Sequence, residues 1–529
     1  MMWLLLVLHA HAGLGPDGQP LAGDPPELVR VDDPNHPGAL VRTGEAALLA
    51  APPTDGTPWS YETLAVPDGW TDELGSAALN ADLWHARGWR GQGVRVAVFD
   101  IQWEQATLDP LMLGEVQTAD CVAHRSCALP LDSVAPTFGY EVGAHGVACA
   151  DTVHDLAPEA ELFAVRVNGV TTFASAAEWA IREGIDVISM SMSFFNDSFY
   201  DGTGPFTAVL QRLEAHDVLV VTSAGNYARA HWDGAWRDVD GDGRLDFDGS
   251  NGLELGVQPN GGRPLFVTWN EFNACGLSDL DAYVYAPDGL LVGRSERRQD
   301  DGERGCDPVE RVAIQSRGPG VYRLEVVGHR VQAAHLQVDV LGTGGVVVVD
   351  PVVERSLADP AAHPLAFVVG AVRAEGYLGN DIEGFSSRGP SRAGVPKPDL
   401  AGPDGLSTSV FGARGFFGTS AATPAVAAAV ALVMSRDPSL TPRQAAQRLQ
   451  AWAWSEEDPL QVEDPRWGPG KARLPLPEAL DAGGGGCGRP EGTPAWLLLL
   501  LLSPRRRGAA RRASCRSTGG PARRGSGPA

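Results

Sequence analysis

Positive charge is scarce in this sequence. Its 529 residues include 42 Lys and Arg against 66 Asp and Glu, which gives a formal net charge of −24 at pH 7. The imbalance is greater before Arg505, because the residues from there to the end include eight Arg and no acid. So acidic a chain is not expected to bind nucleic acid. It is typical of a soluble extracellular protein, whose acidity serves either calcium binding or simple solubility.

Long apolar runs are also missing. The N-terminal run "MMWLLLVL" and the C-terminal run "WLLLLLL" are both too short to cross a bilayer. The Ala-His-Ala at residues 10–12 follows the first run in the manner of a signal-peptide cleavage site, although no Lys or Arg precedes the run. We therefore expect residues 1–12 to be a signal peptide and the protein to be exported.

Cysteine is infrequent, with seven in the chain. Cys121 and Cys127 are close neighbours, and Cys275 and Cys306 flank an Asp-rich segment, so each pair is a plausible disulfide in an oxidising compartment. Cys149 lies among apolar residues and is expected to be a buried thiol. The spacing does not prove either pairing.

Apolar strands alternate with helical patterns over most of the chain, which predicts an α/β fold with a doubly wound parallel sheet and helices on both of its faces. Residues 13–75, rich in Pro, Gly and Asp, are expected to be an irregular N-terminal arm or a short pro-segment. The strands are predicted at 94–99, 161–167, 186–193, 218–225 and 365–372. The helices are predicted at 175–185, 206–215, from Ser420 onwards and at 441–453.

A different pattern interrupts this rhythm. Short alternating segments separated by Gly, Pro and Asp turns fill residues 249–348 and predict an antiparallel β-sandwich. The α/β domain would then consist of residues 76–235 and 349–475, with the β unit inserted between them. Residues 476–529 are expected to be a Gly linker followed by a basic tail.

Three residues could together carry acyl-transfer chemistry. Ser420 begins an apolar helix, His145 stands at the start of another, and Asp100 ends a predicted strand, where parallel α/β sheets bind ligands. Each alone has a simpler interpretation: a helix cap, a structural histidine or a turn residue. Together they follow the chain order Asp, His, Ser of a known nucleophile–base–carboxylate triad. Asn226, which follows another strand, could donate to a developing oxyanion.

These motifs resemble the subtilisin-like serine protease family (peptidase S8). The matching segments are "VRVAVFD" at Asp100, "HGVACADTV" at His145, "TSAGN" at Asn226 and "GTSAATPAVAAAVAL" at Ser420. The resemblance implies that Ser420 is the nucleophile, His145 the general base and acid, and Asp100 the residue that orients the imidazole. Asn226 would share the oxyanion hole with the Ser420 backbone N–H.

The resemblance also implies a substrate-binding segment, formed by Ser191, Met192 and Ser193 together with Gly225. Ser193 stands where the family has Gly, so a side chain there could narrow the pocket for the residue before the scissile bond. Two further departures surround the triad: the family's Asp-Thr/Ser-Gly reads Asp-Ile-Gln at 100–102, and its His-Gly-Thr-His reads His-Gly-Val-Ala at 145–148. Neither removes a triad residue.

An acidic loop at 236–248 is the candidate metal site. Its sequence "DVDGDGRLD" predicts Ca²⁺ ligands at Asp238, Asp240, Asp242 and Asp246, with the Arg244 carbonyl as another. The twelfth position of the loop is Gly rather than Glu, so an unliganded acidic turn is the alternative. No catalytic cofactor is expected. In the inserted unit, the acids of "SDLDAYVY" (residues 278–285) are expected to be turn or edge residues.

The tail resembles the C-terminal sorting signals of myxobacterial surface proteins (the MYXO-CTERM type). Such signals contain a Cys, an apolar stretch and an Arg cluster, and here imply processing near Cys487 and retention at the cell surface. The inserted unit resembles, more weakly, the jelly-roll domains of secreted bacterial proteases.

The favoured function is therefore that of a monomeric serine endopeptidase, extracellular or at the bacterial cell surface, that acts on proteins or peptides through an acyl-enzyme. An inactive scaffold of the same fold, binding protein or glycan through the β unit, is the alternative. An esterase of the α/β-hydrolase type is disfavoured, because no G-x-S-x-G surrounds Ser420.

Overall fold

The computed structural model describes residues 28–33, 36–42, 73–103, 116–128, 131, 143–258, 262–272, 277–299, 307–455 and 464–482. The predicted signal peptide, the C-terminal sorting tail and the Cys275–Cys306 pair lie outside these residues.

A seven-stranded parallel sheet forms the centre of the α/β domain, as the sequence predicted. Its strand order is β18-β17-β7-β6-β3-β5-β4. The chain therefore leaves β3 towards one edge and later returns to build outwards on the other side. The carboxyl end of β3 lies at this reversal, where open α/β sheets bind ligands. The strands are β3 (Arg95–Asp100), β4 (Gln117–Asp120), β5 (Glu161–Arg166), β6 (Val187–Met190), β7 (Leu219–Ser223), β17 (Phe367–Arg373) and β18 (Leu400–Asp404).

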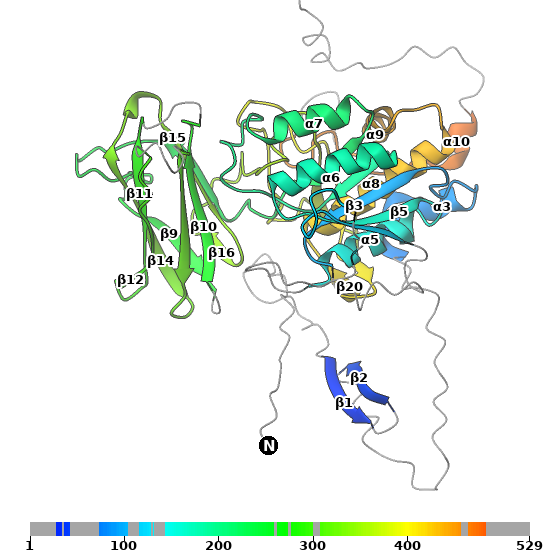
Figure 1. Cartoon of the computed structure of the whole chain (residues 1–529), viewed down its shortest axis with the longest axis horizontal. Helices are drawn as coiled ribbons and strands as arrows, with labels where there is room; N and C mark the ends of the chain where they lie inside the picture. The colour runs from blue at the N-terminus through cyan, green and yellow to red at the C-terminus, as the bar shows by residue number, and fades with distance from the viewer. Residues whose placement is uncertain are drawn as a thin grey trace, which may run out of the picture. The chain divides into compact units, whose positions relative to one another are not determined.

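Helices cover both faces of this sheet. On one face α6 and α7 run side by side (Figure 1) and share a core with Ala97 and Phe99 of β3. Because strand side chains alternate, Asp100 belongs to the opposite face, where α5 and α8 pack together against the strands. The helices are α2 (Glu73–Leu79), α3 (Ala81–His85), α5 (His145–Leu156), α6 (Val170–Glu183), α7 (Phe206–Glu214), α8 (Thr419–Arg436), α9 (Pro442–Ala451) and α10 (Pro477–Ala482).

The long helix α8 is apolar all round because it is buried all round. Its length and hydropathy would suffice for a membrane span, but 83% of it is buried inside the fold. Small residues let it approach the sheet closely: a Cβ added to Gly402 of β18 would lie 2.7 Å from the carbonyl oxygen of Ala422. This helix is therefore a core element that fixes Ser420 against the strand ends.

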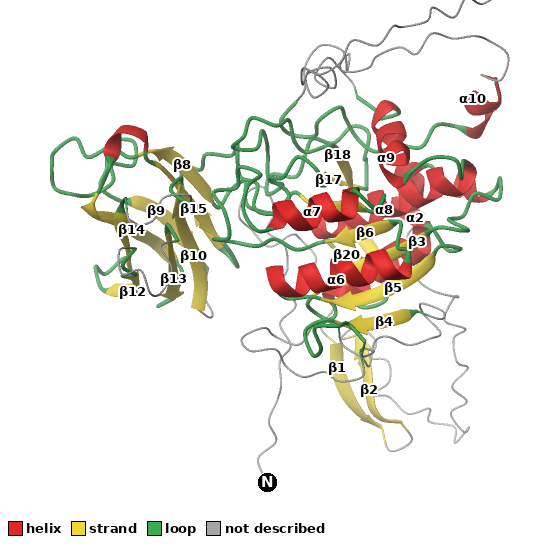
Figure 2. Ribbon diagram, turned by 45° about the horizontal axis from the view of Figure 1, so that its top comes forward, coloured by secondary structure: helices red, strands yellow, loops and turns green. Residues whose placement is uncertain are grey.

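Two antiparallel sheets (Figure 2) are formed by residues 231–348, between the two parts of the α/β domain in the sequence. They share one core, to which Trp269, Tyr322 and Leu255 contribute fully buried side chains. One sheet contains β8 (His231–Ala235), β10 (Gly262–Trp269), β13 (Val309–Gln315) and β15 (Gln337–Gly342). The other contains β9 (Leu253–Val257), β11 (Asp279–Tyr285), β12 (Leu291–Ser295), β14 (Gly320–Arg330) and β16 (Val346–Val348).

Several element boundaries differ from the predictions. Strand β8, placed by the sequence at the end of the first α/β segment, pairs with β15 and so belongs to the β unit. Residues 191–193, predicted to end a strand, follow β6 as loop. The N-terminal arm, predicted to be irregular, contains the antiparallel pair β1 (Leu28–Asp33) and β2 (His36–Arg42). A second small pair consists of β19 (Leu406–Thr408) and β20 (Gly412–Phe416), and residues 333–335 form a 3₁₀ turn.

The cysteine predictions hold where the structure describes them. Cys121 and Cys127 form a disulfide directly after β4. Cys149 is a free, buried thiol on α5.

A buried ionic network joins the β unit to the α/β domain. Arg392, only 6% exposed in its side chain, contacts the carboxylates of Asp233 on β8 (3.0 Å) and Asp339 on β15. Asp339 also accepts a hydrogen bond from His231 at 2.9 Å, and Arg355 pairs with Asp233 at 2.9 Å. Burial by itself raises the pKa of Asp339, but Arg392 and His231 outweigh this and hold that pKa below its usual value. The negative charge of Asp339 therefore depends on its two partners, Arg392 and His231.

Replacing Arg392 with Ala should strongly destabilise the protein. It leaves the buried Asp339 without its main counter-charge and Asp233 with Arg355 alone, which costs about 3–5 kcal/mol. Urea unfolding measures the loss. The matched control is Arg294→Ala, because Arg294 is 63% exposed and its pair with Glu296 contributes roughly 0–1 kcal/mol. Equal, small losses in both variants would show that the network does not hold the two parts together.

Candidate active site

A short hydrogen bond joins Asp100 to His145. Asp100 is the last residue of β3 and is fully buried, whereas His145 is the first residue of α5 and its side chain is 27% exposed. The His145 Nδ1 lies 2.6 Å from Oδ2 of Asp100. The other carboxylate oxygen accepts the backbone N–H of Gln102 at 2.9 Å. The altered residues after Asp100 thus still supply a backbone donor that orients this carboxylate.

The start of α5 can approach Asp100 because residue 146 is glycine. A Cβ there would lie 2.8 Å from both the Asp100 Cβ and the Trp103 ring. The Trp103 indole N–H in turn lies 3.2 Å from the carbonyl oxygens of Asp100 and Val165. Trp103 therefore holds the ends of β3 and β5 together beneath the histidine.

Two opposing effects set the pKa of His145. Burial lowers it, and the charge and hydrogen bond of Asp100 raise it; the carboxylate prevails, so the pKa lies above the usual 6.5. The Phe416 ring packs edge-on against the imidazole, with 5.8 Å between ring centroids. The imidazole is therefore fixed in position and is a stronger base than a free histidine.

Ser420 is the second residue of α8. Pro424 has no N–H for the helical hydrogen bond to the Ser420 carbonyl, which is therefore free for other donors. The Ser191 hydroxyl donates to it at 3.0 Å, and the Cys149 thiol lies 3.7 Å from it. The Cys149 sulfur also lies within 4.8 Å of ligand atoms of Asp100 and His145. Cys149 therefore contacts the Ser420 backbone on one side and lies close to Asp100 and His145 on the other.

The side-chain amide of Asn226 is oriented by Thr419. Its Oδ1 accepts the Thr419 N–H at 3.0 Å and the Thr419 hydroxyl at 2.9 Å. These two donors leave the amide Nδ2 free to donate, 3.0 Å from where a Gly418 Cβ would stand. The Ser420 N–H, in the first turn of α8, has no partner within the helix. Two donors are therefore available next to the serine.

Gly418 has a left-handed backbone (φ 102°), the conformation that favours glycine. Its N–H donates to the buried carboxyl of Asp404 at 3.0 Å. Burial raises the pKa of Asp404 to about 7. No pattern in the sequence indicated this support, because Asp404 ends a strand that was not predicted.

The four predicted substrate-binding residues lie at the ends of the adjacent strands β6 and β7. Ser191 is buried against Ser420, whereas Met192 and Ser193 are partly exposed. The Gly225 N–H donates to the Thr419 hydroxyl at 3.2 Å. Ser191 and Gly225 therefore contact Ser420 and its neighbour Thr419, respectively.

Cys149 was predicted to be buried but not to lie under the triad. Its spacing of four residues from His145 puts both on the same face of α5, which is the signal that could have placed it there. Burial and the nearby Asp100 raise the pKa of the thiol well above its usual value, so Cys149 stays protonated at neutral pH.

The acidic loop brings three of its four predicted carboxylates together. Ligand atoms of Asp238, Asp240 and Asp242 all lie within 4.8 Å of one another. Asp246 instead accepts the Val239 N–H at 2.6 Å. The Arg244 guanidinium pairs with Asp242 at 2.7 Å, and this hydrogen bond lowers the pKa of that carboxyl.

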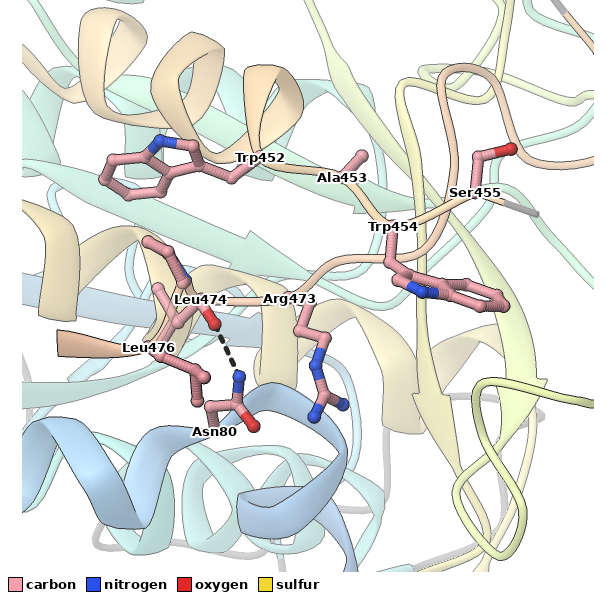
Figure 3. Close-up of a pocket in the computed structure, with 9 residues that line it drawn as sticks. Asn80, Trp452, Ala453, Trp454, Ser455, Arg473, Leu474 and Leu476 are labelled. Carbon is pink, nitrogen blue, oxygen red and sulfur yellow. Dashed lines mark hydrogen bonds between the residues drawn. The ribbon is translucent and has the colours of Figure 1, made fainter. Parts of the chain in front are cut away.

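A pocket of about 450 Å³ opens elsewhere, between α3 and the segment after α9 (Figure 3). There the Asn80 amide donates to the Leu474 carbonyl at 2.6 Å, and Trp452, Trp454 and Arg473 line the walls. The pocket contains none of the residues that the sequence predicted for catalysis or binding.

The model of the subtilase family matches residues 91–255 and 349–469, which together make up more than half of the chain. The chain belongs to the subtilase family. The two matched segments of this subtilase contain Asp100, His145, Asn226 and Ser420. The segment between them, 256–348, contains most of the two antiparallel sheets.

Two curated proteins are similar to this subtilase over short stretches. Serine protease AprX of Bacillus subtilis is 31% identical over 127 residues, which cover 20% of this chain and 29% of AprX. Subtilisin DY of Bacillus licheniformis is 28% identical over 174 residues, which cover 30% of this chain and 56% of that protein. This subtilase therefore matches less than two thirds of the length of either relative.

One solved structure resembles this chain in fold over a larger share of its length. The Clostridium perfringens CspB protease superposes with a TM-score of 0.51 at 18% identity, covering 75% of this chain and 95% of that one. At this identity the likeness concerns the fold alone.

Asp100→Asn should lower the pKa of His145 below 6.5. The change removes the charge that raises the pKa, while the burial that lowers it remains. NMR of isotope-labelled histidine, with His145→Gln to assign the signal, measures the titration. A pKa that stays above 6.5 in Asp100→Asn would mean that Asp100 is not the group that raises it.

Proposed function

We propose that this subtilase is a secreted or cell-surface serine endopeptidase that cleaves peptide bonds through an acyl-enzyme. The observation that carries the proposal is the buried Asp100–His145 hydrogen bond, to which the Ser420 backbone is linked through Cys149. A hydroxyl is a weak nucleophile until a neighbouring base accepts its proton, and this arrangement supplies that base.

Each residue has a role in the proposed reaction. Ser420 attacks the peptide carbonyl carbon while His145 takes the hydroxyl proton. The same proton then passes to the leaving amine, and water releases the acyl group by the reverse sequence. Asp100 stabilises the imidazolium, in keeping with the raised pKa of His145. The Asn226 amide and the Ser420 N–H donate to the oxyanion.

The surroundings of the triad favour an active enzyme over the inactive scaffold. The departures at residues 101–102 retain a backbone N–H for Asp100, and those at 147–148 leave the His145 contact intact. The oxyanion donors are likewise oriented before substrate arrives. No catalytic cofactor is required by these steps.

We also propose that the acidic loop binds one structural Ca²⁺. Asp238 has a buried Oδ1 without a hydrogen-bond partner among the described residues, while its Oδ2 accepts the Gly243 N–H at 3.1 Å. Asp240 and Asp242 would supply further carboxylate oxygens, the donors that this cation prefers. Binding of Ca²⁺ would weaken the ion pair between the Arg244 side chain and Asp242.

Export is supported by the Cys121–Cys127 disulfide, since such bonds persist in oxidising compartments. The signal peptide, attachment through the C-terminal tail and the monomeric state belong to the same proposal, as do protein or peptide substrates.

A fluorophosphonate probe, which phosphonylates activated serines with loss of fluoride, should label the purified full-length protein and not Ser420→Ala. The labelling rate should fall as the pH drops through a value above 6.5, because only neutral His145 can accept the proton. Mass spectrometry locates the label. An unlabelled wild type that unfolds cooperatively would instead support the scaffold.

Millimolar Ca²⁺ should raise the unfolding temperature of the protein relative to a chelator. Binding at 100 times the dissociation constant adds about 2.7 kcal/mol of stability. Asp238→Asn and Asp240→Asn should abolish most of the rise, whereas the exposed Asp288→Asn should keep it. Identical unfolding temperatures with Ca²⁺ and with chelator would refute the site.

A further inference from the structure

The residue after the oxyanion asparagine is a tyrosine that folds back across the site. Segments 191–193 and 225–227 leave the ends of β6 and β7, adjacent strands that flank Ser420. A Cβ added to Gly225 would lie 2.4 Å from Cε2 and 2.6 Å from Cδ2 of Tyr227. The Tyr227 ring therefore occupies the space directly against Gly225, one of the residues expected to receive substrate.

The far end of this ring reaches the opposite segment. Burial raises the pKa of the Tyr227 hydroxyl, and the nearby Ser193 side chain partly offsets this increase. The side chains of Ser193 and Tyr227 therefore lie close together, between the two segments. A glycine at 193 would remove this neighbour of the hydroxyl.

Further contacts keep Tyr227 in place. Its N–H donates to the Ser387 hydroxyl at 3.0 Å. Phe195 packs edge-on against its ring, with 5.4 Å between centroids, and stacks on Phe266 of β10 at 4.5 Å. The ring is therefore braced by the β unit and cannot swing aside without disturbing an aromatic row.

We propose that Tyr227 and Ser193 close the pocket for the residue before the scissile bond, so that the enzyme cleaves after Gly, Ala or Ser. This inference rests on the proposed function. Leu, Phe or Tyr at that position would collide with the Tyr227 ring. One extra or missing methylene in a pocket changes the ratio of kcat/KM values by roughly tenfold or more. The difference in kcat/KM between a small and a large residue at this position should therefore be large.

Quenched fluorescent peptides that differ only at this position, Ala against Phe, test the inference on the full-length protein. Active-site concentration is titrated with the fluorophosphonate probe, so that each kcat/KM refers to working enzyme. Wild type should prefer Ala by at least about tenfold. Tyr227→Ala should raise the Phe-to-Ala ratio by at least about tenfold, and Ser193→Gly should raise it less. Tyr285→Ala, a tyrosine of β11, should leave the ratio unchanged.

The outcomes separate the two proposals. Wild type that is labelled by the probe but cleaves the Phe peptide as well as the Ala peptide overturns the closed pocket and leaves the protease intact. Absence of labelling overturns both. If Tyr227→Ala does not fold, the wild-type ratio and Ser193→Gly still decide: an Ala preference that relaxes in Ser193→Gly supports the pocket.

Discussion

The placing of a charged carboxylate at the end of a buried strand is the constraint on which the rest of the structure depends. Asp100 is fully enclosed, so its charge has to be matched by donors that arrive from elsewhere in the chain. His145 and the Gln102 backbone supply them. Gly146 lets His145 approach the carboxylate closely, and the Trp103 indole holds the ends of β3 and β5 together. Helix α8, from a distant part of the sequence, then completes the site.

Polar groups around Ser420 are satisfied in a way that leaves the reactive ones free. Because Pro424 has no N–H, the Ser420 carbonyl lacks its helical hydrogen bond. The Ser191 hydroxyl donates to this carbonyl instead, and the Cys149 thiol lies close to it. Thr419 occupies only the oxygen of Asn226. Among the described residues, the Ser420 hydroxyl, the His145 imidazole and two N–H groups therefore keep unused hydrogen-bonding capacity, which is a preorganisation of the kind that acyl transfer needs.

Much of this arrangement was predictable from the sequence, and the reasons for the exceptions are physical. Continuous β-branched runs predicted β3 and β7, and helix-start motifs indicated His145 and Ser420. By contrast, β18 contains Gly, Pro and Asp, and it is a strand because β17 pairs with it rather than through its own propensity. The partners of Arg392 come from distant segments, and local patterns do not encode such pairings. Tyr227 was likewise missed, because its importance lies in the direction of its ring.

The inserted β unit has a consequence for how the chain folds. Its two ends meet, since the Val348 N–H donates to the Arg229 carbonyl at 2.8 Å. Strands β7 and β17, neighbours in the central sheet, pair across the whole unit, so their pairing also requires that these ends come together. Closing so long a loop through a disordered chain would be slow, whereas a β unit that folds first leaves only a short gap to close. A β unit that folds first would therefore speed the folding of the sheet.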